Sequence, residues 1–164
     1  MRTAICPGSY DPITLGHLNI IRRSSKIFDE VVVCVMHNRT KNAPMFSIDE
    51  KLAMIKRVVE RFPNVKVDYY SGLLAEYARQ FENPVVVKGL RAASDFEYEF
   101  QMNQVNKRLN PELETMFLTA SEKYTFLSSS VIREMAMYGA DIRGLVPDEI
   151  VEDIEIKAKA WRAK

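Results

Sequence analysis

The sequence predicts an α/β fold with a doubly wound, five-stranded parallel sheet. Short apolar runs alternate with helical patterns along the whole chain, and the runs are rich in β-branched residues, as in strands buried on both faces. No internal repeat or low-complexity tract interrupts this alternation. Such a pattern forms right-handed βαβ units with helices on both faces of the sheet. The 164 residues suit a single domain over 1–164 that ends in a helix.

Five strands are expected at the short apolar runs. These are Thr3–Cys6, Val31–Met36, Val65–Tyr70, Val85–Val87 and Thr115–Leu118. Pro7-Gly8 is expected to end the first strand and Lys88-Gly89 to close the fourth.

Helices are expected where apolar residues recur every three or four positions. They are His17–Phe28, Ile48–Phe62, Leu73–Phe81, Asp95–Leu109, Ser128–Met137 and Asp148–Trp161. Two capping boxes, each a serine followed three residues later by a glutamate, mark two of the starts: Ser47 with Glu50, and Ser94 with Glu97.

Composition and charge exclude several classes of protein. Lys and Arg number 23 against 22 Asp and Glu, so the chain lacks the basic excess of a protein that coats nucleic acid. No apolar run approaches the ~20 residues that cross a bilayer, and the N-terminus lacks the apolar stretch of a signal peptide. Cys6 and Cys34 sit in apolar runs and are expected to be buried thiols. We therefore expect a cytoplasmic protein with neither a nucleic-acid nor a membrane partner.

Ligands of such a sheet bind beyond the carboxyl ends of the strands. After the first strand, Gly8 would let backbone approach a phosphate, and Gly16-His17 falls at a helix start, where backbone N–H groups are unpaired. His17 could donate to a phosphate oxygen there; an ordinary histidine near a helix start is an equal alternative.

Three further loops on the same edge suit anions. Lys41 follows the second strand, and Lys88 and Arg91 bracket the end of the fourth. Asp95 and Glu99 share one helix face, either as acids that complement a helix start or, for Glu99, as an acceptor from a ribose hydroxyl. The serines at 128–130 supply one N-cap and two further hydroxyls.

Several common site patterns are absent from the sequence. There is no Walker-type phosphate loop and no Gly-x-Gly-x-x-Gly turn. No Cys/His cluster suggests zinc, and no Ser/His/Asp set is evident. The surviving interpretation is a phosphate-binding pocket assembled from four loops.

The motifs that fill these loops resemble one family. They are PGSYDPITLGH at 7–17, GLRA at 89–92, DFEYE at 95–99 and SSS at 128–130. From Ile5 to about Pro147 the sequence is similar to the bacterial phosphopantetheine adenylyltransferases of the nucleotidylyltransferase superfamily, in which Thr14 replaces the first histidine of a His-x-Gly-His motif. The resemblance implies a Rossmann-like nucleotidylyltransferase fold. It also implies transfer of AMP from ATP to 4′-phosphopantetheine, giving dephospho-coenzyme A and pyrophosphate.

The resemblance also implies residue roles. The catalytic residues it implies are His17, Lys41 and Arg91. The residues it assigns to ATP are Ser9, Tyr10, His17, Gly89, Leu90, Arg91, Glu99, Tyr124, Thr125, Phe126, Leu127, Ser128, Ser129 and Ser130. Those it assigns to phosphopantetheine are Ser9, Lys41, Leu74 and Lys88. It further implies Mg²⁺ with ATP, a homohexamer, and inhibition by coenzyme A, and it implies no metal-ligating side chain.

Lys88 departs from the family, which usually has arginine there; lysine supplies a point charge without the bidentate fork. Other expectations remain open. The chain could transfer a nucleotidyl group to nicotinamide mononucleotide or glycerol phosphate, although Thr14 and the 95–99 segment argue against both. It could also be a non-catalytic nucleotide sensor or a structural oligomer on the same scaffold.

Overall fold

The computed structural model describes residues 1–37 and 43–163. Its strands are β1 (Thr3–Gly8), β2 (Glu30–Met36), β3 (Val65–Tyr70), β4 (Pro84–Leu90) and β5 (Glu114–Thr119). They pair in the order β3-β2-β1-β4-β5, and every pairing is parallel. The predicted five-stranded parallel sheet is therefore confirmed.

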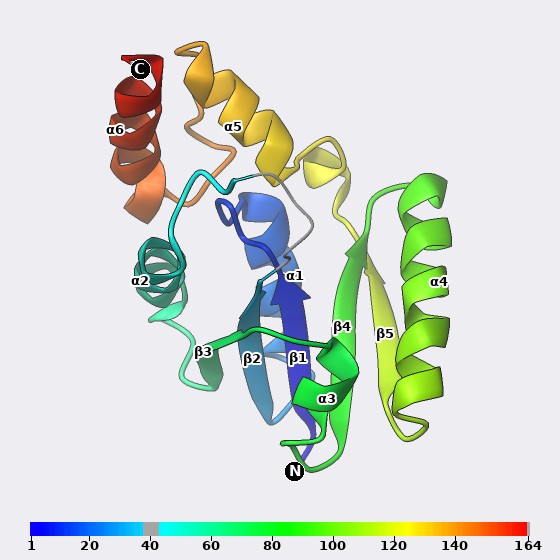
Figure 1. Cartoon of the computed structure of the whole chain (residues 1–164). Coiled ribbons are helices and arrows are strands. Elements are labelled where there is room, and N and C mark those ends of the chain that lie inside the picture. Colours follow the sequence, from blue (N-terminus) through cyan, green and yellow to red (C-terminus); the bar gives the residue numbers. More distant parts are fainter. Residues whose placement is uncertain (38–42, 164) are drawn as a thin grey trace.

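The helices cover both faces of this sheet (Figure 1). They are α1 (Leu15–Ser24), α2 (Ile48–Val59), α3 (Leu74–Ala78), α4 (Ala93–Leu109), α5 (Ser129–Met137) and α6 (Val151–Arg162), with 3₁₀ turns at Glu122–Tyr124 and Asp148–Ile150. One core cluster joins one face of the sheet to α1, α2, α5 and α6. A second, smaller cluster joins the other face to α3. The sheet is doubly wound, as predicted.

The two cysteines lie on opposite faces of the sheet. Cys6 belongs to the first core cluster and Cys34 to the second, and both are free and buried. Burial raises the pKa of each thiol to about 12. Both are therefore buried thiols, as the sequence predicted.

The strand order places a topological switch point beside β1. The chain runs outward from β1 to β2 and β3, and then returns to pair β4 against the other side of β1. Loops after β1 and β4 therefore leave the sheet in opposite directions and open a crevice between them. In Figure 1, α5 and α6 lie beyond the carboxyl ends of the strands, on the side where this crevice opens.

Two strands run further than the sequence predicted. Pro7 and Gly8 do not end β1 but pair with Cys34 and Val35 of β2. β4 pairs with β1 only opposite Thr3–Ile5, so beyond Ile5 the side of β1 that faces β4 is unpaired. Pro7, which has no N–H, can stand there without the loss of a hydrogen bond between strands. On β4, Lys88 and Gly89 stay in the strand because β5 pairs with it as far as Leu90.

One of the two capping boxes is confirmed and the other is wrong. Ser47 Oγ accepts from the Glu50 N–H at 3.2 Å, and the Glu50 carboxylate accepts from the Ser47 N–H at 2.7 Å. α4 instead begins after Ala92, with no side-chain cap from Ser94. Asp95 takes over the start of this helix by accepting from the Arg91 N–H at 3.1 Å. Within the described residues, no helix is both long and apolar enough to cross a bilayer.

Candidate active site

Three adjoining cavities open at the carboxyl edge of the sheet. We call them the central cavity, between the β1–α1 loop, the end of β4 and the start of α5; the α4 groove, between α4 and the segment at 72–74; and the α2–α5 cavity, between the starts of those two helices. Glu99 lines all three, and Lys88 lines the central cavity and the α4 groove. The cavities are thus parts of one continuous site.

Most of the residues singled out in the sequence meet in this site. The central cavity is lined by Tyr10, His17, Lys88, Gly89, Arg91, Glu99, Tyr124, Leu127, Ser128 and Ser129. Ser9, Leu74 and Lys88 line the α4 groove, and Ser130 lines the α2–α5 cavity. Leu90, Thr125 and Phe126, all within the described ranges, lie outside the lining of these three cavities. Lys41 lies outside the described residues.

The imidazole of His17 is held in one tautomer. α1 begins at Leu15 with Thr14 as its N-cap, so His17 is the third residue of the helix. The Thr14 N–H donates to His17 Nδ1 at 2.9 Å. Because a backbone N–H can only donate, Nδ1 must be unprotonated, and the proton of the neutral ring sits on Nε2. This leaves Nε2–H as a hydrogen-bond donor for a ligand in the cavity.

His17 stays uncharged near neutral pH. Burial, then the charges of Arg91 and Lys88, lower its pKa to about 4. The ring of Tyr10 contacts the imidazole edge to face, with 5.1 Å between ring centroids. Gly8 makes room for that arrangement, because a Cβ there would lie 3.0 Å from the Tyr10 ring. Its missing side chain thus makes room for Tyr10, and the approach of a phosphate to Gly8, which lines the central cavity, stays a prediction.

The guanidinium of Arg91 is fixed by three hydrogen bonds to two residues. Its Nε and Nη2 donate to the two carboxylate oxygens of Asp95 at 3.0 and 3.2 Å, and Nη1 donates to the Leu127 carbonyl at 2.7 Å. Burial alone would raise the pKa of Asp95, but the hydrogen bonds and charge of Arg91 hold it below its ordinary value. The guanidinium is therefore oriented before any ligand arrives.

Lys88 is paired in a similar way with Glu99. The ammonium lies 3.3 Å from Glu99 Oε1, and both side chains are largely buried. Asp95 and Glu99 are four residues apart on α4, so one helix face supplies a carboxylate to each cation. An incoming phosphate must compete with these carboxylates for both cations.

The three serines at α5 are all engaged. Ser128 caps the helix by accepting from the Val131 N–H, the Ser129 hydroxyl donates to the Pro12 carbonyl at 2.7 Å, and Ser130 Oγ accepts from Arg133. Of the two hydroxyls expected to be spare, that of Ser129 therefore holds the β1–α1 loop, and that of Ser130 contacts Arg133 within α5. Because Ser128 already takes the Val131 N–H, an anion site at this helix start would rest on the other N–H groups of the first turn.

The α4 groove contains residues that the sequence did not single out. Leu73, Tyr98, Met102 and Leu109 give it an apolar wall. Asn103 and Thr115 also line it, and their Oδ1 and Oγ1 are buried atoms without a hydrogen-bond partner among the described residues. Buried unpaired polar atoms are costly, so they mark places where a ligand can complete the bonding. A helix pattern cannot reveal them, because their value depends on the groove that surrounds them.

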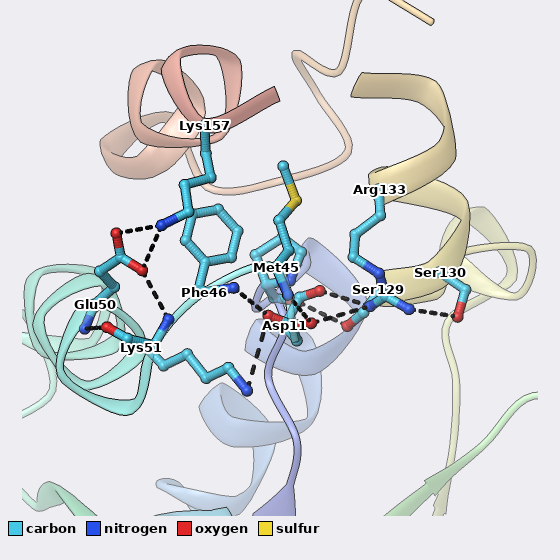
Figure 2. Close-up of polar contacts among 11 residues, drawn as sticks. Asp11, Met45, Phe46, Glu50, Lys51, Ser129, Ser130, Arg133 and Lys157 are labelled. Atoms are coloured by element: carbon cyan, nitrogen blue, oxygen red, sulfur yellow. Dashed lines mark hydrogen bonds and ion pairs between the residues drawn. The ribbon is translucent and has the colours of Figure 1, made fainter. Parts of the chain in front are cut away.

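Asp11 was also missed. Its carboxylate is buried and contacts both the segment before α2 and Arg133 of α5 (Figure 2). The only signal in the sequence is its place between Tyr10 and Pro12, where an aspartate usually serves as an ordinary turn residue.

Known proteins resemble this chain over nearly its whole length. The cytidylyltransferase-like family matches residues 5–135. A phosphopantetheine adenylyltransferase from Clostridium tetani is 53% identical over 154 residues, covering 94% of this chain and 96% of the relative. Another from Dictyoglomus turgidum is 50% identical over 159 residues, covering 97% of this chain and 99% of the relative.

A solved structure has the same fold. It is a putative nicotinate-nucleotide adenylyltransferase from Vibrio parahaemolyticus, which superposes with a TM-score of 0.70 over 99% of this chain and 96% of its own. At 16% identity this likeness concerns the fold alone. On the family match and the two full-length relatives, the chain belongs to the cytidylyltransferase-like family and, within it, to the phosphopantetheine adenylyltransferases.

Proposed function

We propose that this chain transfers AMP from ATP to 4′-phosphopantetheine, with dephospho-coenzyme A and pyrophosphate as products. The observation that carries the proposal is the central cavity, where the Nε2–H of His17 and the cations Lys88 and Arg91 converge. Two relatives that are 53% and 50% identical in sequence over nearly the whole chain are named phosphopantetheine adenylyltransferase. Two phosphate-bearing substrates repel one another, and converging cations offset that repulsion.

The reaction needs no general base on the protein. The phosphate of phosphopantetheine has a second pKa of ~6 and is already an anionic nucleophile at neutral pH. One of its oxygens attacks the α-phosphorus of ATP, and the bond from that phosphorus to the bridging oxygen of pyrophosphate breaks. His17 Nε2–H donates to an oxygen of the α-phosphate as charge builds there. A neutral donor on a fixed ring performs this without a proton-transfer step.

The two substrates fit different parts of the site. In the proposed arrangement ATP occupies the central cavity, with Arg91 and the start of α5 at its phosphates. The pantetheine arm lies in the α4 groove, where apolar side chains contact its chain and Asn103 and Thr115 meet its amide and hydroxyl groups. Lys88 lines both spaces, which suits a residue at the phosphate that joins them.

Magnesium enters the proposal as part of the substrate. Mg²⁺ prefers phosphate oxygens and keeps several waters, so it is expected to arrive bound to ATP. Within the described part of the chain, no three His, Cys, Asp or Glu side chains gather closely enough to hold a metal ion. The nearby carboxylates of Asp95 and Glu99 are occupied by Arg91 and Lys88.

The direct test is an assay of pyrophosphate release from Mg-ATP. Purified protein is mixed with Mg-ATP and 4′-phosphopantetheine, and nicotinamide mononucleotide replaces the acceptor in a parallel reaction. Release of pyrophosphate with phosphopantetheine as the acceptor, but not with nicotinamide mononucleotide, supports the proposal. Faster release with nicotinamide mononucleotide would assign the chain to another nucleotidyl acceptor.

Substitutions of His17 should separate catalysis from binding. His17→Ala removes the Nε2–H donor, so kcat should fall roughly 10²–10³-fold, as for loss of one preorganised donor. The Kd for ATP, measured by titration calorimetry, should change far less. His17→Gln, whose amide nitrogen can approach the Nε2 position, should keep more activity than His17→Asn, whose shorter amide reaches only the Nδ1 position. Equal losses in kcat and ATP affinity would contradict the role.

The ionisation of His17 provides a second prediction. Because its pKa is lowered to about 4, the imidazole should remain neutral as the pH falls through the ordinary histidine range near 6.5 and should gain a proton only near pH 4. Side-chain ¹⁵N NMR should show an Nε2–H tautomer throughout this range. Protonation at an ordinary histidine pKa would overturn the assignment of a neutral donor.

Lys88→Arg should tighten phosphopantetheine binding. A guanidinium can form two parallel hydrogen bonds to a phosphate, whereas the lysine offers a point charge. Titration calorimetry should give a lower Kd for the variant, and Lys56→Arg, on the exposed side of α2, should leave the affinity unchanged. Weaker or unchanged binding in Lys88→Arg would count against the assigned position of the phosphate.

We also propose that the protein assembles as a homohexamer. No side chain of α4, a helix described along its whole length, is fully buried. Phe96 and Phe100 lie against one another on it and are 45% and 49% exposed. Exposed apolar surface of this kind suits a subunit interface, and a second copy of the chain is the proposed occupant.

Phe100→Glu should lower the molecular mass in solution. Light scattering on the wild type should give six times the 18.9 kDa of the chain, and a charge in the interface should shift the mass to smaller species. Tyr138→Glu, at an 85% exposed aromatic residue after α5, serves as the control that keeps the wild-type mass. A monomeric wild type would refute the proposal.

Inhibition by coenzyme A and a cytoplasmic location stay predictions from the family resemblance.

A further inference from the structure

Asp11 is a buried carboxylate that the reaction described above does not use. It lies in the β1–α1 loop between Tyr10 and Pro12 and is 7% exposed. Burial of an aspartate is unfavourable unless hydrogen bonds and opposite charges surround it. Figure 2 shows that its partners come from two helices and from the segment that leads into one of them. Such a set of contacts calls for an explanation beyond turn formation.

The shortest contacts of the carboxylate are to backbone. Oδ2 accepts from the Met45 N–H and Oδ1 from the Phe46 N–H, both at 2.9 Å. Hydrogen bonds to an ionised acceptor are about twice as strong as neutral ones. They tie the β1–α1 loop to the segment before α2, which forms part of the wall of the α2–α5 cavity.

Cations from α2 and α5 complete the cluster. Lys51 Nζ lies 3.8 Å from Oδ1, and Arg133 Nη1 lies 3.6 Å from Oδ2. The same Arg133 nitrogen donates to the Asp11 carbonyl at 2.7 Å, and the Ser129 hydroxyl donates to the Pro12 carbonyl at 2.7 Å. The carbonyls of two consecutive loop residues, Asp11 and Pro12, are therefore bonded to α5, while the Asp11 carboxylate is bonded to the segment before α2.

The segment before α2 is braced from behind by α6. Lys157 donates to both carboxylate oxygens of Glu50, at 2.7 and 2.9 Å, and its ammonium lies 5.7 Å from the centre of the Phe46 ring. Glu50 in turn accepts a hydrogen bond from the N–H of Ser47, the N-cap of α2. The segment to which Asp11 is hydrogen-bonded is therefore itself held in place by contacts with α6 (Figure 2).

The loop that Asp11 fastens holds a strained residue, Tyr10, and contacts His17 at the start of α1. Tyr10 has φ +45°, a backbone conformation that persists only when surrounding contacts enforce it. Its hydroxyl donates to the Cys6 carbonyl at 2.8 Å, and its ring contacts the His17 imidazole. Three residues after Asp11, Thr14 orients that imidazole through its N–H. Movement of the loop would therefore displace the Nε2–H donor.

We propose that Asp11 is a positioning residue for adenylyl transfer, which holds the β1–α1 loop between the segment before α2 and the start of α5 and so fixes His17. This inference rests on the proposed function for its link to catalysis. Asp11 itself is assigned no contact with substrate. Its effect on the reaction is transmitted through Tyr10, Thr14 and His17.

The test begins with Asp11→Asn. The amide keeps one acceptor but places its NH₂ against one of the two backbone N–H groups, so the loop loses a bond and the cluster loses its negative charge. We expect kcat to fall roughly 10–100-fold, as for a small misplacement of a catalytic group, with little change in the Kd for ATP. An unchanged kcat in the folded variant would overturn the proposal.

A double variant separates positioning from general damage. Once the imidazole is gone its position no longer matters, so adding Asp11→Asn to His17→Ala should slow turnover by no more than about twofold beyond His17→Ala alone. Losses that multiply would show that Asp11 does not act through His17. Tyr77→Phe is the matched control: it removes the partly buried hydrogen bond to Asp68, 2.6 Å long, on the other face of the sheet, and should lower stability without lowering kcat.

Hydrogen exchange supplies a readout that does not need turnover. In Asp11→Asn the Thr14 amide should exchange at least about tenfold faster, while amides of β2 such as Val33 keep their wild-type protection. Unchanged exchange at Thr14 would overturn the proposal even if the wild type proved inactive in the pyrophosphate assay. If Asp11→Asn does not fold, Arg133→Leu, which removes the α5 contacts to Asp11, must give the same pattern for the proposal to stand.

Discussion

The site depends on the parallel pairing of β1 between β2 and β4. This pairing sends the loops after β1 and β4 apart at one edge of the sheet and creates the crevice in which the central cavity lies. The apolar residues on both faces of the sheet make the position of β1 rigid. A loop anchored to such a strand can hold a donor such as Nε2–H of His17 where a flexible surface loop could not.

The cations of the site are paired with carboxylates before any ligand binds. Each of the two described cations at the end of β4 has a carboxylate partner from one face of α4, and His17 stays neutral beside them. The ion pairs keep the partly buried Lys88 and the more exposed Arg91 in place, each beside an opposite charge. In the proposed reaction, phosphate oxygens of the substrates would replace these carboxylate partners, and both cations already line the cavity that would receive them.

The sequence was sufficient for the sheet, because alternating apolar runs and helical periodicity report burial directly. It also placed His17, Lys88 and Arg91 at one edge, since carboxyl ends of parallel strands share an edge. It could not reveal the roles of Asp11, Asn103 or Thr115, which depend on partners distant in the chain. The Ser94 box failed because Asp95 and Arg91 formed a stronger local contact at the same helix start. The Ser129 hydroxyl is taken by a tertiary partner, the Pro12 carbonyl, that no local pattern contains, and the Ser130 hydroxyl by Arg133 one turn further along the same helix.

The two buried cysteines have a consequence for redox chemistry. Phosphopantetheine and its adenylylated product both carry a free thiol, and Cys6 lies along the wall of the central cavity. Exchange between thiols and disulfides proceeds through the thiolate, and a pKa of about 12 leaves almost none of it on Cys6 or Cys34 at neutral pH. At neutral pH, so low a thiolate fraction makes both cysteines slow to attack a disulfide.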